Sequence, residues 1–364
     1  MEKEERIQLS VVDVERKYSF NPAETVYGGG NAIVSWGLDN DIPKLLGNCY
    51  DKSSTLAAAI NQSVNYVLGD DIVVTDEASY WKEKINRRGQ TVKDLLSVWA
   101  MDYYIYGNFA AQIIFNALGL PVEIYPLDIA KCRLNETKDK VFYSKKGWSK
   151  YSTKSDCYDR FGYADFDAEH PTQIFFWNGN GVRKFYNPAP WQSALNDVLT
   201  EAETSLYCLK NVTAGFSAKY LITFPDTANL TDEQKKIVET GIREKFCGYD
   251  ADSNFMLYWA NDEGKNLTVS KIEADGSPEL LQQVRQGTRT NIFTSLRISP
   301  LLCGLTEGTT TGFASQEFSD SFRLFDRTVA SPVRDILVGS IDKIIGVEDG
   351  VKIVPFTISF SDEN

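Results

Sequence analysis

The stretch from residue 191 to residue 209, WQSALNDVLTEAETSLYCL, has a regular apolar pattern. Its apolar positions step by 4, 3, 4, 4 and 3 residues and are Trp191, Leu195, Val198, Ala202, Leu206 and Leu209. An α-helix has about 3.6 residues per turn, so these positions share one face. The pattern predicts a long amphipathic helix that ends before Gly215.

A second long helix is predicted to begin at Ser277 and Pro278, an N-cap residue followed by a proline at the first helical position. Its apolar stripe consists of Leu281, Val284, Ile292 and Leu296. Arg285 and Arg289 border this stripe, and Ser299-Pro300 ends the helix.

The segment between the two helices, residues 216–275, has the pattern of a small α/β unit. A strand is predicted over 219–224 and another over 255–259, with a helix between them whose capping box is Thr231 and Gln234. The segment is acidic, with 11 Asp+Glu against 7 Lys+Arg. Two long helices that flank one insert are expected to run antiparallel, because connections in folds are short.

After the second helix comes a loop of small polar residues that includes Thr309 to Thr311 and ends near Gly312. A third long helix is predicted over 315–345. It carries Phe318, Phe322, Phe325 and Val329 on one face, and Pro332 is expected to kink it. One chain is expected to have too few elements to cover the apolar stripes of both long helices. This favours packing of these helices between subunits.

The first 190 residues are predicted to form a mixed α/β lobe. Helices are expected over 53–68 and 91–107, and strands over 109–115, 121–127, 140–143 and 173–177. Residues 103–122 carry no charge, but they include Asn, Gln, Gly and Pro. We therefore interpret them as a helix that leads into a strand, and not as a membrane span.

Composition excludes several classes of function. The chain of 364 residues has 50 Asp+Glu against 38 Lys+Arg, a net charge of -12, which argues against a protein that coats nucleic acid. His170 is the one histidine, so multi-histidine metal sites and most histidine-based catalysis are excluded. The six cysteines form no CxxC pair, and the charged N-terminus does not look like a signal peptide. We expect a soluble, cytoplasmic protein with reduced thiols.

No catalytic motif is apparent in the sequence. It contains neither a phosphate-binding GxxxxGK[ST] loop nor a GxSxG nucleophile elbow. Carboxylate pairs such as Asp39 with Asp41 and Asp70 with Asp71 are more typical of solvated turns than of metal sites. We predict no enzyme activity, no cofactor and no metal. A hydrolase that uses paired carboxylates is disfavoured.

Taken in order, the elements resemble those of the portal proteins of tailed double-stranded DNA bacteriophages. The motifs that carry the resemblance are Tyr106-Gly107-Asn108, Pro126-Leu127-Asp128, Tyr186-Asn187-Pro188-Ala189-Pro190-Trp191, Ile298-Ser299-Pro300-Leu301-Leu302-Cys303-Gly304 and Phe318 to Phe325. Each motif is weak alone, and their order over residues 40–346 is the specific feature.

The resemblance implies an α+β portal-like subunit with a mixed α/β wing, an antiparallel helical stem, a small α/β clip and a long kinked helix. The expected ranges are 1–190 for the wing, 191–215 for the first stem helix, 216–275 for the clip, 277–298 for the second stem helix, 300–314 for the channel loop, 315–346 for the kinked wing helix and 347–364 for a C-terminal strand or short crown.

The function implied by the resemblance is an oligomeric ring at one capsid vertex of the virion. The ring, expected to be a dodecamer assembled in the host cytoplasm, would be the channel for DNA packaging and ejection. Its implied partners are the packaging ATPase (the large terminase subunit), the tail adaptor, the major capsid protein and double-stranded DNA that passes through without tight binding. No membrane is implied. A neck or tail ring protein without motor contact is the alternative.

The expected site residues fall into two groups. The clip interface is expected to include Thr231, Gln234, Tyr249 and Trp259. The channel is expected to be lined by Arg285, Arg289, Thr309, Thr310 and Thr311. Arginine side chains at the stripe border are long enough to reach towards a channel and form a basic belt. The other interpretation is that both arginines pair with Asp197, Glu201 or Glu203 of the first stem helix.

Overall fold

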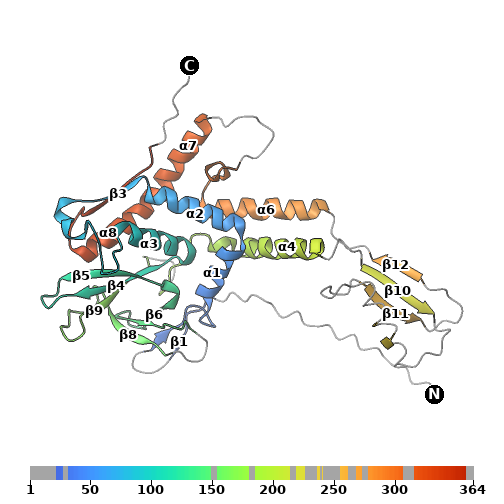
Figure 1. Cartoon of the computed structure of the whole chain (residues 1–364), viewed down its shortest axis with the longest axis horizontal. Coiled ribbons are helices and arrows are strands. Elements are labelled where there is room, and N and C mark those ends of the chain that lie inside the picture. The colour runs from blue at the N-terminus through green and yellow to red at the C-terminus, as the bar shows by residue number, and fades with distance from the viewer. Residues whose placement is uncertain are drawn as a thin grey trace. The chain divides into compact units, whose positions relative to one another are not determined.

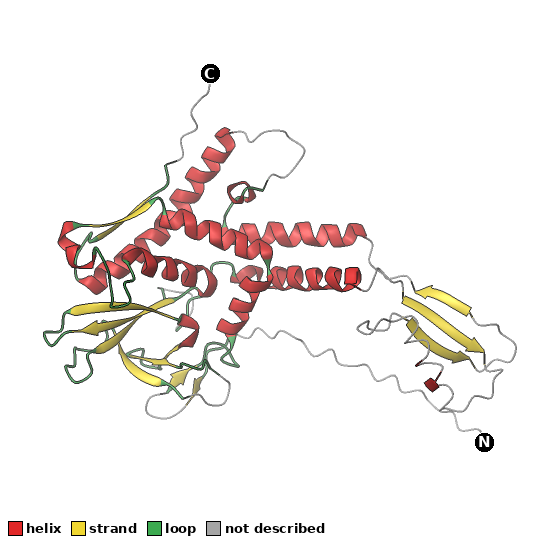
Figure 2. Ribbon diagram, viewed as in Figure 1, coloured by secondary structure: helices red, strands yellow, loops and turns green. Residues whose placement is uncertain are grey.

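The computed structural model of the chain combines helices with mixed sheets (Figures 1 and 2). The structure describes residues 22–27, 32–148, 154–179, 185–213, 219–225, 236–237, 240, 255–260, 268–272, 278–305 and 315–357. The chain divides into two units. The first unit is Met1–Asn48, Ile60–Pro190 and Thr309–Asn364, and the second unit is Cys49–Ala59 and Trp191–Gly308.

Except for the helix over residues 42–52, which was not predicted, the helices follow the predicted periodic segments. They are α1 (Ile42–Lys52), α2 (Ser54–Leu68), α3 (Val92–Tyr106), α4 (Leu195–Thr213), α6 (Pro278–Leu296), α7 (Ser315–Phe325) and α8 (Ser331–Ile345). Short 3-10 turns lie at Asp76–Trp81, Ile129–Lys131, Gln192–Ala194 and Pro300–Cys303. The first stem helix was predicted from Trp191. Its first turn is a 3-10 turn, so the α-helix begins at Leu195.

The described strands form four sheets. They are β1 (Val26–Tyr27), β2 (Ile33–Val34), β3 (Asp71–Val74), β4 (Phe109–Phe115), β5 (Pro121–Leu127), β6 (Cys132–Leu134), β7 (Lys140–Tyr143), β8 (Asp156–Arg160), β9 (Thr172–Trp177), β10 (Lys219–Pro225), β11 (Phe255–Ala260), β12 (Thr268–Ile272) and β13 (Val351–Val354). The largest sheet has the order β5-β4-β9-β8-β7-β6, and its pairs are antiparallel except β8 with β9.

Helix α3 covers one face of this sheet, as Figure 2 shows. The Trp99 ring is fully buried, with centroid distances of 4.9 Å to Phe109 and 5.6 Å to Phe175. Its indole N–H donates a hydrogen bond to the Ala110 carbonyl oxygen at 3.0 Å, so the polar edge of the ring is satisfied. The helix begins with a capping box between Thr91 and Asp94. Trp99 therefore belongs to the core between α3 and the sheet.

The end of α3 lies against a distant part of the same unit. Gly107 ends the helix with φ 75°, a left-handed conformation that favours glycine. A Cβ atom at this position would lie 2.5 Å from the backbone carbonyl of Pro188. The motifs around Gly107 and Pro188, which carry part of the resemblance, are thus packed together without room for a side chain.

The kinked helix contains a wide turn. A π turn, Asp326–Ala330, separates α7 from α8, and Pro332 follows in the first turn of α8. Proline has no N–H to donate to the carbonyl four residues earlier, at Thr328, so regular helical bonding fails there. The irregularity predicted at Pro332 therefore lies in the turn before it. Arg334 donates to the carbonyl oxygens of Tyr66 and Val67 and to the Asp326 carboxylate.

The C-terminal strand pairs with the first unit's β3. Strand β13 runs antiparallel to β3, with Val351 opposite Val74 and Val354 opposite Asp71. The sequence predicted a C-terminal strand or short crown over 347–364. The structure has the strand over Val351–Val354, and residues 358–364 lie outside the described part of the chain.

The second unit contains α4, α6 and a sheet with the order β11-β10-β12. Strands β10 and β11 are parallel, the arrangement expected for the predicted strand–helix–strand unit. The third strand, β12, pairs antiparallel with β10 and was not predicted. Residues Thr231, Gln234 and Tyr249 of the insert, and Thr309 to Thr311 of the loop, lie outside the described residues.

Candidate functional site

Helices α4 and α6 run antiparallel and side by side (Figure 1). The Asn291 Nδ2 atom, near the end of α6, donates a hydrogen bond to Asp197 Oδ1 at the start of α4, over 2.8 Å. At the other end of the pair, Tyr207 of α4 and Leu281 of α6 line the same groove. The antiparallel stem predicted from the order of elements is confirmed.

The burial of the apolar stripe changes along this stem. Leu195 and Val198 of α4 are buried, as are Ile292 and Leu296 of α6. In contrast, Leu206, Tyr207 and Leu209 near the end of α4 are exposed, and so is Leu280 at the start of α6. On α6 the stripe residues Leu281 and Val284 are half-buried, so it is mainly the end of α4 that leaves apolar surface exposed. Exposed apolar surface of this kind favours contact with another molecule.

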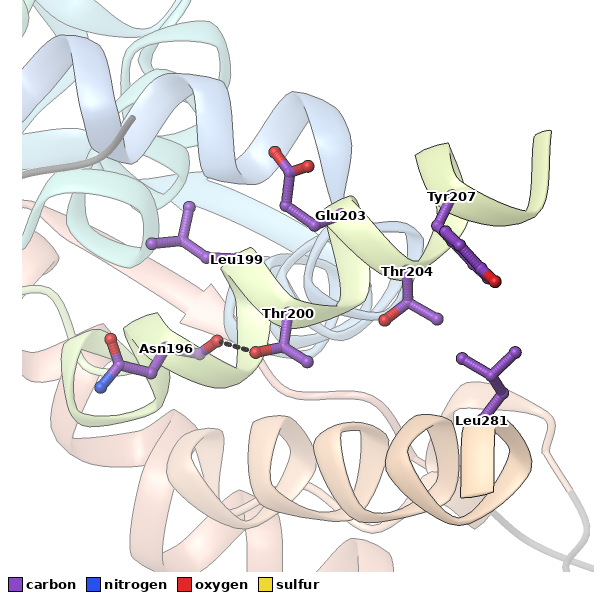
Figure 3. A pocket seen from close by; sticks show the side chains of 7 residues that line it. All are labelled: Asn196, Leu199, Thr200, Glu203, Thr204, Tyr207 and Leu281. Atoms are coloured by element: carbon purple, nitrogen blue, oxygen red, sulfur yellow. Dashed lines mark hydrogen bonds between the residues drawn. The ribbon is translucent and has the colours of Figure 1, made fainter. Parts of the chain in front are cut away.

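A groove runs along the stem from Asn196 to Tyr207 of α4 (Figure 3). Its volume is about 580 Å³, and it is lined by Asn196, Leu199, Thr200, Glu203, Thr204, Tyr207 and Leu281. Figure 3 shows Thr200, Thr204 and Tyr207 on the side of α4 that faces α6. The Thr200 hydroxyl donates to the Asn196 carbonyl oxygen at 2.8 Å, so this polar group is satisfied within the helix. Residues one turn apart with short side chains leave a furrow into which larger side chains fit.

Glu201 of α4 binds the residues at the start of α2. Its Oε1 atom accepts hydrogen bonds from the Thr55 Oγ1 atom at 2.7 Å and from the Thr55 N–H at 3.3 Å. Its Oε2 atom also accepts a hydrogen bond from the Ser53 hydroxyl. Backbone N–H groups in the first turn of a helix have no partner within the helix, and the helix dipole favours an anion there. Glu201 is thus a cap supplied from a distant helix.

The two stem arginines differ in their surroundings. Arg285 is exposed, whereas Arg289 is half-buried with its guanidinium 5.9 Å from the centroid of the Phe293 ring. Burial raises the pKa of the neighbouring Cys303 thiol to about 11, and the positive charge of Arg289 acts in the opposite direction. Arg289 is therefore held against the stem, and Arg285 extends into solvent.

The other interpretation, ion pairs between these arginines and α4, has no such pair to support it among the residues that the structure describes. Asp197 accepts a hydrogen bond from Asn291, and Glu201 binds the start of α2. Among the described residues, the ion pairs include neither Arg285 nor Arg289. Trp259, a predicted clip residue, lies on β11 opposite Phe224 of β10.

Two features of the stem could not be found from local sequence. Glu201 lies 146 residues from Thr55, so no local pattern joins them, although the Ser53-Ser54-Thr55 run is itself typical of a helix start. The groove also depends on how two helices pack.

The described residues contain no group of three or more His, Cys, Asp or Glu placed to hold a metal ion. None of the described helices combines the length and the apolar character needed to span a bilayer.

Solved structures of similar fold support the arrangement. The neck of a native gene transfer agent particle, computed with C12 symmetry, contains a chain with 12% identity and a TM-score of 0.55. The match covers 92% of this chain and 86% of that one. The crystal structure of an HK97 family phage portal protein from Corynebacterium diphtheriae has 11% identity and a TM-score of 0.53, over 84% of this chain and 92% of that one. A comparison with curated proteins gives no match.

The family model described as phage portal protein matches residues 64–331. This range covers 268 of the 364 residues, and it includes α3, the large sheet, both stem helices and the π turn. The chain therefore belongs to the phage portal protein family.

Proposed function

We propose that this chain assembles into a closed ring, a dodecamer in the virion, through which double-stranded DNA is packaged and ejected. The observation that carries the proposal is the apolar surface that the stem leaves exposed, where Leu206 and Tyr207 of α4 are exposed and Tyr207 lines the groove. A cyclic ring is built from one repeated interface in which two different surfaces of each subunit meet. The similar chain in the C12 neck supports the subunit number. Membership in the family makes the protein a structural component and not an enzyme.

In this proposal the groove receives the stem of the adjacent subunit. Its volume of about 580 Å³ and its lining of threonine, tyrosine and leucine side chains fit the side of a helix. The exposed fraction of Tyr207 is 45%, so the ring buries an aromatic side chain that one subunit leaves in water.

The channel assignment rests on Arg285. Its exposed side chain, repeated around a ring, makes a belt of positive charge in an otherwise acidic protein of net charge -12. Such a channel attracts DNA locally and repels it overall, so DNA moves without tight binding. Arg289 is proposed to contribute less than Arg285 to the positive charge of the channel, because its guanidinium lies over the Phe293 ring. Thr309 to Thr311 are proposed to narrow the channel without adding charge.

Residues 216–275 are proposed as the clip, which docks the packaging ATPase and the tail adaptor through Thr231, Gln234, Tyr249 and Trp259. The wing is proposed to contact the major capsid protein. Deletion of residues 216–275 is expected to leave a soluble protein that no longer docks either partner. Normal DNA packaging by the deletion variant would favour the alternative, a neck or tail ring protein without motor contact.

Ring assembly is tested by measuring mass in solution. Wild-type protein is expected to give rings in light scattering, and Thr204→Arg is expected to remove them because a long charged side chain fills the groove. Thr294→Arg is the matched control, since Thr294 is an exposed threonine of α6 outside the groove lining. A wild-type protein that stays monomeric at every concentration contradicts the proposal.

The channel is tested by Arg285→Ala. Rings of this variant are expected to form normally but to package DNA more slowly, with a weaker dependence on salt concentration. If the variant forms fewer rings and these rings package normally, Arg285 acts in assembly and not in the channel.

A further inference from the structure

Two exposed loops of the first unit carry opposite charges. The basic loop, residues 82–88, has the sequence Lys-Glu-Lys-Ile-Asn-Arg-Arg, with four basic side chains against one acidic. The acidic loop, residues 162–170, has the sequence Gly-Tyr-Ala-Asp-Phe-Asp-Ala-Glu-His, with three carboxylates and no lysine or arginine. Both loops lie within the described residues, and their charged side chains are exposed.

The basic loop is fixed to the edge of the large sheet. The Ile124 N–H of β5 donates to the Ile85 carbonyl oxygen at 2.8 Å, so Ile85 ties the middle of the loop to an edge strand. Arg87 pairs with Glu123 at 2.6 Å, while Lys82 and Lys84 form no ion pair within the described residues. Tyr80 lies just before the loop, and 67% of it is exposed.

The acidic loop is fixed elsewhere on the same sheet. It joins β8 to β9, and the Phe166 ring packs on Phe115 at a centroid distance of 5.7 Å. The tip of the β4–β5 hairpin lies beside it, since a Cβ atom on Gly119 would be 3.2 Å from the Phe166 ring. Leu118 at that tip is 83% exposed, which is the largest exposure among the large apolar residues described. The acidic loop is thus bordered by an apolar patch.

The two surfaces match each other in chemistry. Each combines exposed charge that is mainly of one sign with exposed apolar or aromatic side chains, Tyr80 on one and Leu118 with Phe166 on the other. Within one chain no ion pair joins the two loops among the described residues. A ring interface is heterologous, so it requires two different complementary patches on every subunit. Opposite charges across such an interface select the partner and set its register.

We infer that the basic loop of one subunit docks on the acidic loop and hairpin tip of the next copy of this chain. In this contact Lys82 and Lys84 face Asp165 and Glu169. The contact rests on the proposed ring and adds to it a second interface, in the wing, that does not involve the stem groove.

The experiment reverses the charges of one loop at a time. The variants are Lys82→Glu/Lys84→Glu and Asp165→Lys/Glu169→Lys, with ring fraction measured by mass photometry at one protein concentration. Each variant is expected to lose rings at least fivefold relative to wild type, and the variant with all four changes is expected to regain them. A one-to-one mixture of the two double variants is also expected to form rings, because the subunits then alternate with matched charges. Lys93→Glu/Asp335→Lys, which reverses one exposed charge of each sign outside the loops, is the control and is expected to assemble as wild type does.

Each result decides the matter. If the wild type forms rings and both double variants form them equally well, the proposed loop contact is wrong and the ring proposal still holds. Loss of rings in the double variants without recovery in the fourfold variant or in the mixture also overturns it, because the acidic loop then faces a different surface. A wild type that is monomeric under all conditions overturns both proposals.

Discussion

The side chain of Asn108 binds the backbone of Asn187, which lies 79 residues later in the sequence. The Asn108 Nδ2 atom donates to the Asn187 carbonyl oxygen at 2.8 Å, and the Asn108 Oδ1 atom accepts from the Asn187 N–H at 2.9 Å. In return, Asn187 Nδ2 donates to the Gly107 carbonyl oxygen at 3.2 Å. Asn108 is fully buried, so these bonds replace water completely. The segment that leads out of the first unit at Pro190 is thereby fixed to the end of α3.

Gly107→Ala is expected to destabilise the protein by about 3 kcal/mol. The new Cβ atom would lie 2.5 Å from the Pro188 backbone, and alanine is unfavourable at φ 75°. Gly89→Ala separates the two effects, because Gly89 has φ 76° but nothing within 4 Å of its Cβ position. We expect Gly89→Ala to lower the free energy of unfolding, measured with urea, by about 1 kcal/mol. Equal losses in the two variants would show that the contact with Pro188 has no energetic importance.

Glu201→Ala is expected to lower the free energy of unfolding by about 1–2 kcal/mol. The substitution leaves the Thr55 N–H and the hydroxyls of Ser53 and Thr55 without their acceptor. Glu201→Gln keeps one acceptor oxygen and loses the charge, so an intermediate loss is expected in thermal unfolding. If Glu201→Gln lowers the free energy of unfolding as much as Glu201→Ala does, the stabilisation comes from the charge of Glu201 and not from its hydrogen bonds.

His170 provides a direct test of the acidic loop. Its Nδ1 atom lies 2.9 Å from Asp167 Oδ2, and this hydrogen bond raises the pKa of the imidazole above its ordinary value of 6.5. A raised pKa means that the pair is fully formed below the unfolded value and is lost as the pH rises through the folded value. NMR titration of the single histidine is expected to show this elevation. Asp167→Asn should return the pKa towards 6.5, and an unchanged midpoint would contradict the pairing.

Arg334→Met is expected to cost about 3 kcal/mol of folding free energy. The buried guanidinium donates to the Tyr66 and Val67 carbonyl oxygens at 2.6 and 3.0 Å and to Asp326 at 2.6 Å. Methionine fills a similar volume, so the loss reports on polar groups left without partners. Arg323→Met, on exposed Arg323 of α7, is the control and should change the melting temperature little. If Arg334→Met and Arg323→Met lower the folding stability by similar amounts, packing and not the hydrogen bonds of Arg334 dominates its contribution.

The sequence allowed the long helices to be predicted because their signals are local, whereas α1 was missed. The stripe from Leu195 to Leu209 and the cap at Thr91 need only a few neighbouring residues to be recognised. The pairing of β13 with β3 was not predicted, because Val351 and Val74 are far apart in the chain and each strand is short. Strand β12 was missed for the same reason, since five residues without strong alternation carry little signal.

The candidate site was predictable in outline and not in its contacts. Arg285 and Arg289 were placed together from their spacing of one turn, yet Phe293 holds Arg289 and leaves Arg285 exposed. Their expected partners Asp197 and Glu201 bind Asn291 and the start of α2, which only the packing of separate helices reveals. The charge of residues 82–88 and 162–170 is visible in the sequence, but their places on one sheet are not.

The π turn at Asp326–Ala330 has a consequence for insertions and deletions in the long helix. Its hydrogen bonds span five residues where an α-helix spans four, so the turn holds one residue more than regular helix needs. Removal of Thr328 would bring the turn to regular α-helical spacing, so the faces of α7 and α8 keep their directions, while Pro332 still lacks an N–H for one backbone hydrogen bond. Removal of a residue from within α8 would instead rotate everything after it by about 100°. The wing helix therefore has one position at which its length can change by a residue without disturbing the core.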